Sequence, residues 1–127
     1  MKNFALLICS FFTVISIGCV SQPVVSSRPA VVWTRDAATE QEKNEVKQQV
    51  LAVLKDPESA RFGEIWALNG SNGGRGVCGF VNAKNSYGGY TGNKTFMLMP
   101  DGSSVKIEGS GIIERMVPKM CAPRTVQ

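Results

Sequence analysis

The residues best suited to binding chemistry lie in one glycine-rich segment, residues 82–94. The segment combines two tyrosines, three asparagines and two lysines, so flat apolar rings stand beside hydrogen-bonding groups. It is also longer than a turn between two strands requires. Two interpretations stay open: a loop that binds a sugar, a peptide or another protein, and a structured turn whose tyrosines pack inward. The candidate binding residues are Asn82, Lys84, Asn85, Tyr87, Tyr90 and Lys94, with Trp66 or Arg75 expected nearby.

Catalytic designs are restricted by the absence of histidine. Without it, Ser–His and Cys–His nucleophiles and His-ligated metal sites are excluded. A glycan hydrolase would need two carboxylates at roughly 5 to 9 Å, for instance Glu64 with Asp101 or Glu108. The chain is short for a substrate cleft, so the hydrolase is the weaker alternative. We expect a non-enzymatic protein with no cofactor and no metal.

Residues 74–79 have the spacing G-x-G-x-x-G, which also occurs in dinucleotide-binding loops. That fingerprint requires a strand before the glycines and a helix after them. Here a strand is expected at 77–82, so the glycines are better explained by a turn and a strand entry. The formal net charge of +4 is too small to indicate a nucleic-acid groove, and no nucleic-acid partner is expected.

The first residues are typical of an export signal. A positive start at Lys2 is followed by an apolar run over residues 4–17, which is shorter than the roughly 20 residues of a transmembrane helix. The run ends in residues 16–19, Ser-Ile-Gly-Cys, which resemble the lipobox of bacterial lipoproteins. Gly18 and Cys19 match the essential pair of that motif, whereas Ser16 departs from the usual leucine. The alternatives are an ordinary cleavage nearby and an uncut anchor.

The lipobox resemblance implies a signal peptide over residues 1–18 and a lipid anchor on Cys19. No aspartate follows the cysteine. By resemblance to enterobacterial sorting, this implies an outer-membrane, periplasm-facing protein in the cell envelope. Residues 22–29 are polar and contain two prolines, which is typical of a stiff linker. We therefore expect a lipidated tether over residues 19–38 and a single domain over residues 39–127.

Of four cysteines, Cys9 lies in the signal and Cys19 is the lipid site. In an oxidising compartment, the remaining Cys78 and Cys121 are expected to form a disulfide. The bond would close a loop of about 43 residues and contribute about 4 kcal/mol. The alternative is a reactive thiol or a metal site, although the chain has no histidine and no CxxC pair.

Hydrophobic spacing predicts one helix over residues 39–55. Thr39 and Glu42 have the spacing of a capping box, and Pro57 disfavours helical geometry at the residue before it. A further turn is expected at 56–62, with Asp56 as its cap and Phe62 pointing inward. The apolar stripe of the helix consists of Val46, Val50, Val53 and Leu54.

Residues beyond 63 change to strand patterns. Strands are predicted at 64–68, 77–82, 95–99 and 104–108, with a hairpin turn at 100–103 and a short fifth strand at 112–116. Residues 30–33 form an apolar patch that docks on the domain. The expected fold is α+β in two layers, one N-terminal helix packed on a small antiparallel sheet of four to five strands, with one disulfide.

Three blocks together resemble a group of small exported proteins and lipoproteins of proteobacteria and their mobile elements. The blocks are residues 54–62 (LKDPESARF), 77–85 (VCGFVNAKN) and 88–92 (GGYTG), with Phe96 after them. The resemblance covers about residues 45–100. It implies one compact domain and no particular mechanism. Phe80 stands where the group has a polar residue, often glutamate.

These observations predict a bacterial envelope lipoprotein with a small non-enzymatic binding domain. Its partners would be the membrane, through the lipid anchor, and an envelope protein or cell-wall peptidoglycan. The alternative is an exclusion or immunity lipoprotein of a phage or plasmid, which would block a receptor or a conjugation channel. That alternative uses the same binding chemistry and differs in the partner.

Overall fold

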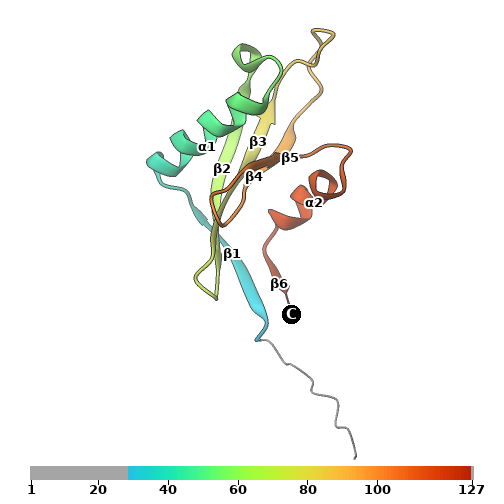
Figure 1. Cartoon of the computed structure of the whole chain (residues 1–127). Helices are drawn as coiled ribbons and strands as arrows, with labels where there is room; N and C mark the ends of the chain where they lie inside the picture. Colours follow the sequence, from blue (N-terminus) through green and yellow to red (C-terminus); the bar gives the residue numbers. More distant parts are fainter. Residues whose placement is uncertain (1–28, 127) are drawn as a thin grey trace, which may run out of the picture.

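The structure, a computed structural model, describes residues 29–126. The predicted signal peptide, Cys19 and residues 20–28 of the predicted tether lie outside these residues. Within the described part, no helix has the length and apolar character needed to cross a membrane. The elements are β1 (Val31–Ala37), α1 (Glu40–Val53), the 3-10 helix η1 (Pro57–Ser59), β2 (Arg61–Gly70), β3 (Arg75–Asn82), β4 (Lys94–Leu98), β5 (Val105–Ile107), α2 (Ile112–Met120) and β6 (Arg124–Val126) (Figure 1).

The six strands form one sheet in the order β5-β4-β3-β2-β1-β6, and every neighbouring pair is antiparallel. Successive strand residues point to opposite faces, so each face has its own core. On one face, α1 contributes Val46 and Val50 to a cluster around Phe96. On the other face, α2 contributes Val117 to a cluster around Trp66. The α+β class is confirmed, but the two-layer arrangement is wrong because helices cover both faces.

The helix predicted over residues 39–55 is present as α1, but it is neither the first element, because β1 precedes it, nor the only helix. Its N-terminus is fixed by the predicted capping box: the Glu42 N–H donates to Thr39 Oγ1 at 3.2 Å, and the Thr39 N–H donates to Glu42 Oε2 at 2.8 Å. Val46 and Val50 are fully buried. Val53 is 56% exposed, so its place in the buried stripe was wrong. It lies in the last turn of α1, which overhangs an open cavity instead of the sheet.

The predicted turn after α1 is confirmed as η1. Asp56 Oδ1 accepts a hydrogen bond from the Ser59 N–H at 3.3 Å, and Pro57 is the first helical residue. Phe62 packs edge-on against Phe96, with ring centroids 6.0 Å apart. The four predicted strands are β2 to β5, with shifted ends. β2 is the longest of them and carries a bulge between Phe62 and Ile65.

Three elements were predicted wrongly. Residues 112–116 are not a fifth strand but the start of α2, which continues through Pro118. Burial of Val117 and the disulfide at Cys121 hold this helix, so tertiary contacts outweigh the unfavourable proline. The sheet also gains β1 and β6, which pair with each other. β1 lies within the predicted tether, where only the apolar patch 30–33 was expected to contact the domain; β6 has only three residues.

The predicted disulfide is confirmed. Cys78 on β3 and Cys121 at the end of α2 are bonded, with their Cα atoms 5.8 Å apart. Both residues are buried beside Trp66, whose indole N–H donates to the Cys121 carbonyl at 3.4 Å. The bond therefore fastens α2 to the face of the sheet opposite α1.

Candidate functional site

The loop between β3 and β4, residues 83–93, lies at the end of the sheet opposite to the start of β1 (Figure 1). The Asn85 side chain stabilises the tip of this loop. The Asn85 side-chain oxygen accepts hydrogen bonds from the Tyr87 N–H at 2.9 Å and the Gly89 N–H at 3.2 Å. The backbone closes the same turn, because the Asn85 N–H donates to the Gly89 carbonyl at 2.9 Å. Gly88 has a positive φ of 80°, which favours glycine at this position. The tip is thus a defined turn.

The base of the loop is also fixed. Lys84 and Tyr90 form an antiparallel bridge, so the loop continues the β3–β4 hairpin. The Lys84 N–H donates to the Ser59 hydroxyl at 2.9 Å. Because Ser59 belongs to η1, this bond joins the loop to the connection between α1 and β2.

The two tyrosines lie in different environments. Tyr87 is 97% exposed, at the tip of the turn. Tyr90 is partly covered by cations: the Arg61 guanidinium carbon is 4.5 Å from its ring centroid, and Lys84 Nζ is 5.6 Å away. The interpretation of a structured turn therefore holds for the backbone, whereas inward packing is wrong for Tyr87.

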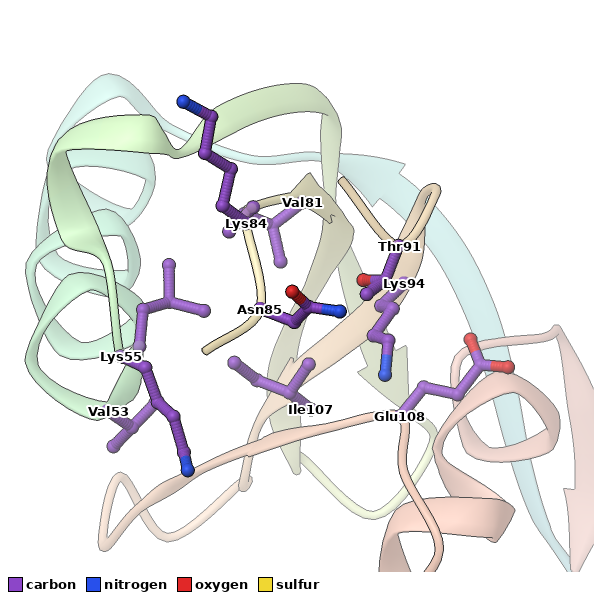
Figure 2. A pocket seen from close by; sticks show the side chains of 11 residues that line it. Val53, Lys55, Val81, Lys84, Asn85, Thr91, Lys94, Ile107 and Glu108 are labelled. Atoms are coloured by element: carbon purple, nitrogen blue, oxygen red, sulfur yellow. The ribbon is translucent and has the colours of Figure 1, made fainter. Parts of the chain in front are cut away.

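An open cavity of about 210 Å³ lies beside the loop. Its apolar surface comes from the end of α1, from β3 and from β5, and Asn85, Thr91 and Lys94 form a polar wall. Figure 2 shows Asn85 extending toward Thr91 and Lys94, whereas Lys55 and Lys84 direct their ammonium groups away from the cavity. The lining residues are Val53, Leu54, Lys55, Val81, Ala83, Lys84, Asn85, Thr91, Lys94, Ile107 and Glu108.

The size of the cavity restricts what it can hold. Small-molecule sites usually measure about 300–1,000 Å³. This cavity is smaller and open, so it suits one side chain or one unit of a longer chain. A ligand that uses it would extend onto the neighbouring loop, where Tyr87 stands in solvent.

The structure separates the predicted binding residues. Lys84, Asn85 and Lys94 line the cavity, whereas Tyr87 and Tyr90 are not part of its lining. Asn82 follows the cavity residue Val81 on β3, so it points to the other face of the sheet. Its side-chain oxygen is buried, and it has no hydrogen-bond partner among the described residues.

Trp66 and Arg75 do not lie beside the loop as expected. Trp66 is buried in the second core, under the Arg35 guanidinium, which is 4.2 Å from its ring. Arg75 is the first residue of β3, at the end of the strand far from the loop, where its Nε donates to Glu42 Oε1 at 2.5 Å. That hydrogen bond is the largest cause that lowers the pKa of Glu42 to about 2.

Several other residues at the site were not predicted from the sequence. Arg61 reaches Tyr90 because its position on β2 pairs with Asn82. Val53 and Ile107 join the cavity from α1 and β5. Nothing in the sequence marks these three residues as binding residues, because only the strand register and the helix packing bring them to the site. Thr91 was the one detectable addition, because it lies inside the tyrosine-containing segment.

The three candidate hydrolase carboxylates have separate local partners. Glu64 forms an ion pair with Arg35. Asp101 accepts hydrogen bonds from the Ser103 N–H at 2.9 Å and the Ser103 hydroxyl at 2.7 Å, and these bonds lower its pKa. Glu108 accepts from the Thr95 N–H at 3.0 Å. A general acid of a glycosidase needs a raised pKa, so the lowered pKa of Asp101 does not favour that role.

Metal ligands do not gather in the described part of the chain: residues 29–126 contain no group of three Asp, Glu, Cys or His side chains placed to hold an ion.

No family model matches the chain, and no match to it was found among curated proteins or among solved structures.

Proposed function

We propose that this protein is a lipid-anchored component of a bacterial envelope whose domain binds another envelope component through the loop 83–93 and the adjoining cavity. The anchor would be Cys19, and the location would be the periplasmic side of the outer membrane. Gly18 and Cys19 support the anchor through their lipobox spacing. The observation that carries the binding role is Tyr87, which is 97% exposed on a turn fixed by Asn85.

Tyr87 has no packing role in the domain that would explain its side chain. An aromatic ring exposed to water contributes no favourable free energy of burial to the fold. Tyrosine is also enriched where proteins bind partners. The turn beneath it is closed by both backbone and side-chain hydrogen bonds. A loop ordered before binding loses less conformational entropy when it engages a partner. Tyr87 is therefore well placed to act as an anchor residue of an interface.

The small cavity favours a macromolecular partner. Its volume of about 210 Å³ accommodates one side chain or one unit of a polymer, while Tyr87 would contact a neighbouring part of the same partner. An envelope protein and a peptidoglycan strand both meet this requirement. An exclusion or immunity lipoprotein would use the same surface against a receptor or a conjugation channel, so partner identification distinguishes the two.

The test compares Tyr87→Ala with Asn93→Ala, a change at an exposed residue of the same loop. For capture, the protein is purified from host membranes after crosslinking. The intact mass of the protein that was not crosslinked tests whether Cys19 carries a lipid. We expect Tyr87→Ala to reduce capture of envelope protein or peptidoglycan by at least tenfold, as for an interface anchor. The melting temperature should not change, and Asn93→Ala should retain capture. Equal capture by wild type and Tyr87→Ala would contradict the proposal.

A further inference from the structure

Helix α2 leaves apolar side chains uncovered on its outer surface. Ile112 is 76% exposed, Met116 is 50% exposed and Ile113 is 49% exposed. These positions recur at helical spacing, so they share one side of α2. Val117, four residues after Ile113, continues this apolar side and is buried in the second core. The helix is therefore amphipathic, but its apolar surface is wider than the core it covers.

Two cations border the exposed apolar residues. Arg115 and Lys119 are both exposed, and at spacings of three and four they lie next to Ile112 and Met116 on the helix surface. Among the ion pairs of residues 29–126, none involves Arg115 or Lys119. The one acid of α2, Glu114, bends its carboxylate back over Gly111 at the helix N-terminus. The outer surface of α2 is thus apolar and positively charged.

We propose that this surface of α2 rests on an anionic phospholipid membrane. Apolar side chains flanked by cations are characteristic of helices that lie in the plane of a membrane surface. The apolar chains enter the boundary between headgroups and acyl chains, while arginine and lysine extend their charges to the phosphates. A neutral apolar partner would explain Ile112 and Met116 but not the adjoining Arg115 and Lys119.

The position of α2 in the fold suits this contact. Three residues connect Met120 to β6, and Val126 of β6 pairs with Val31, the first residue of β1. The loop 83–93 lies at the opposite end of the sheet (Figure 1). Contact through α2 therefore leaves the loop free to face away from the entry of the chain. The inference concerns a different surface from the loop, so it does not rest on the proposed binding function.

The test measures the oxidation of Met116 by hydrogen peroxide in the full chain, mixed with vesicles. One set of vesicles contains phosphatidylcholine alone, and the other also contains phosphatidylglycerol. Peptide mass spectrometry reports the sulfoxide at Met116, with Met99 in the β4–β5 turn as an internal reference. We expect Met116 to oxidise severalfold more slowly on the anionic vesicles.

Two double variants separate lipid contact from general charge effects. Arg115→Glu with Lys119→Glu should abolish the slower oxidation. Lys43→Glu with Lys47→Glu, both on α1, makes the same change in net charge and should retain it. Equal rates on both vesicles would overturn the inference. The inference would also be overturned if the oxidation rate of Met116 depended on the density of protein on the vesicles and not on the lipid charge. In that case a second copy of the chain would cover α2.

Discussion

Gly79 illustrates how one absent side chain sets the packing of the sheet. A Cβ at this position would lie 2.5 Å from Phe96 Cζ and 2.9 Å from the Glu64 carbonyl oxygen. Phe96 is fully buried at the centre of the first core, so it has little room to move. The glycine in the pattern Val-Cys-Gly-Phe-Val is therefore needed to seat Phe96 under α1.

We expect Gly79→Ala to lower the free energy of unfolding by about 1–3 kcal/mol, as overpacking of a core does. Urea unfolding of the purified chain would measure this loss. Gly89→Ala is the matched control, because its Cβ would meet only the Asn85 side-chain oxygen, at 3.9 Å. The packing argument fails if the two variants unfold at the same urea concentration.

At the scale of elements, Glu42 links the start of α1 to the sheet. Its carboxylate accepts from the Thr39 N–H within the capping box and from two guanidinium nitrogens of Arg75, at 2.5 Å and 3.0 Å. The Arg75 hydrogen bond, followed by those from Thr39, lowers the pKa of Glu42 from 4.5 to about 2. One carboxylate therefore caps a helix and fastens it to β3.

This arrangement predicts a pH dependence of stability. Because the folded pKa lies below the unfolded one, the contribution of Glu42 is fully present above pH 4.5 and is lost as the pH falls toward 2. Glu42→Gln should lower the free energy of unfolding near neutral pH by about 1–2 kcal/mol and weaken the acid dependence in this window. Urea midpoints measured across the window test it, with Glu45→Gln on the exposed surface of α1 as the control. An unchanged acid dependence in Glu42→Gln would contradict the assignment.

The elements that could be predicted well from the sequence are those that begin at a local signal. The capping box of Thr39 and the Asp56–Pro57 start each act within a few residues, so they can be seen without the fold. The start of α2 was misassigned because Ile112 and Ile113 are β-branched and Pro118 is unfavourable in a helix. The contacts that stabilise α2 come from Cys78 and Trp66, which are far away in the sequence.

The candidate site likewise combines features set by local sequence with features set by contacts between distant residues. Its loop could be predicted from composition, because tyrosine, asparagine and glycine cluster in one segment. The exposure of Tyr87 could not, since it depends on the turn that Asn85 closes. The cavity could not be predicted either, because strand pairing and helix packing bring Ile107 and Val53 beside the loop.

At the scale of the whole molecule, the Cys78–Cys121 disulfide joins the second core to the C-terminal segment across a separation of 43 residues. Closing a loop of this length stabilises a fold by about 4 kcal/mol in the chain-entropy model. Reduction should therefore lower the free energy of unfolding by about 3–4 kcal/mol, and α2 should be released from the sheet.

Urea unfolding with and without reductant measures this effect. Trp66 fluorescence is a suitable reporter, because the indole N–H donates to the Cys121 carbonyl. The variant Cys78→Ala with Cys121→Ala should resemble the reduced protein and should not respond to reductant. A wild-type midpoint that does not change on reduction would show that the bond contributes little.

The double pairing of β1 has a mechanical consequence. β1 forms five residue pairs with β2 and three with β6, and the chain enters it at Val31. Tension applied there acts along the strand, so it loads these backbone hydrogen bonds in shear and they must yield together. Tension applied through β6 meets only the three pairs with β1. A domain pulled between a membrane anchor and a bound partner would therefore resist force best when the load arrives through its N-terminal strand.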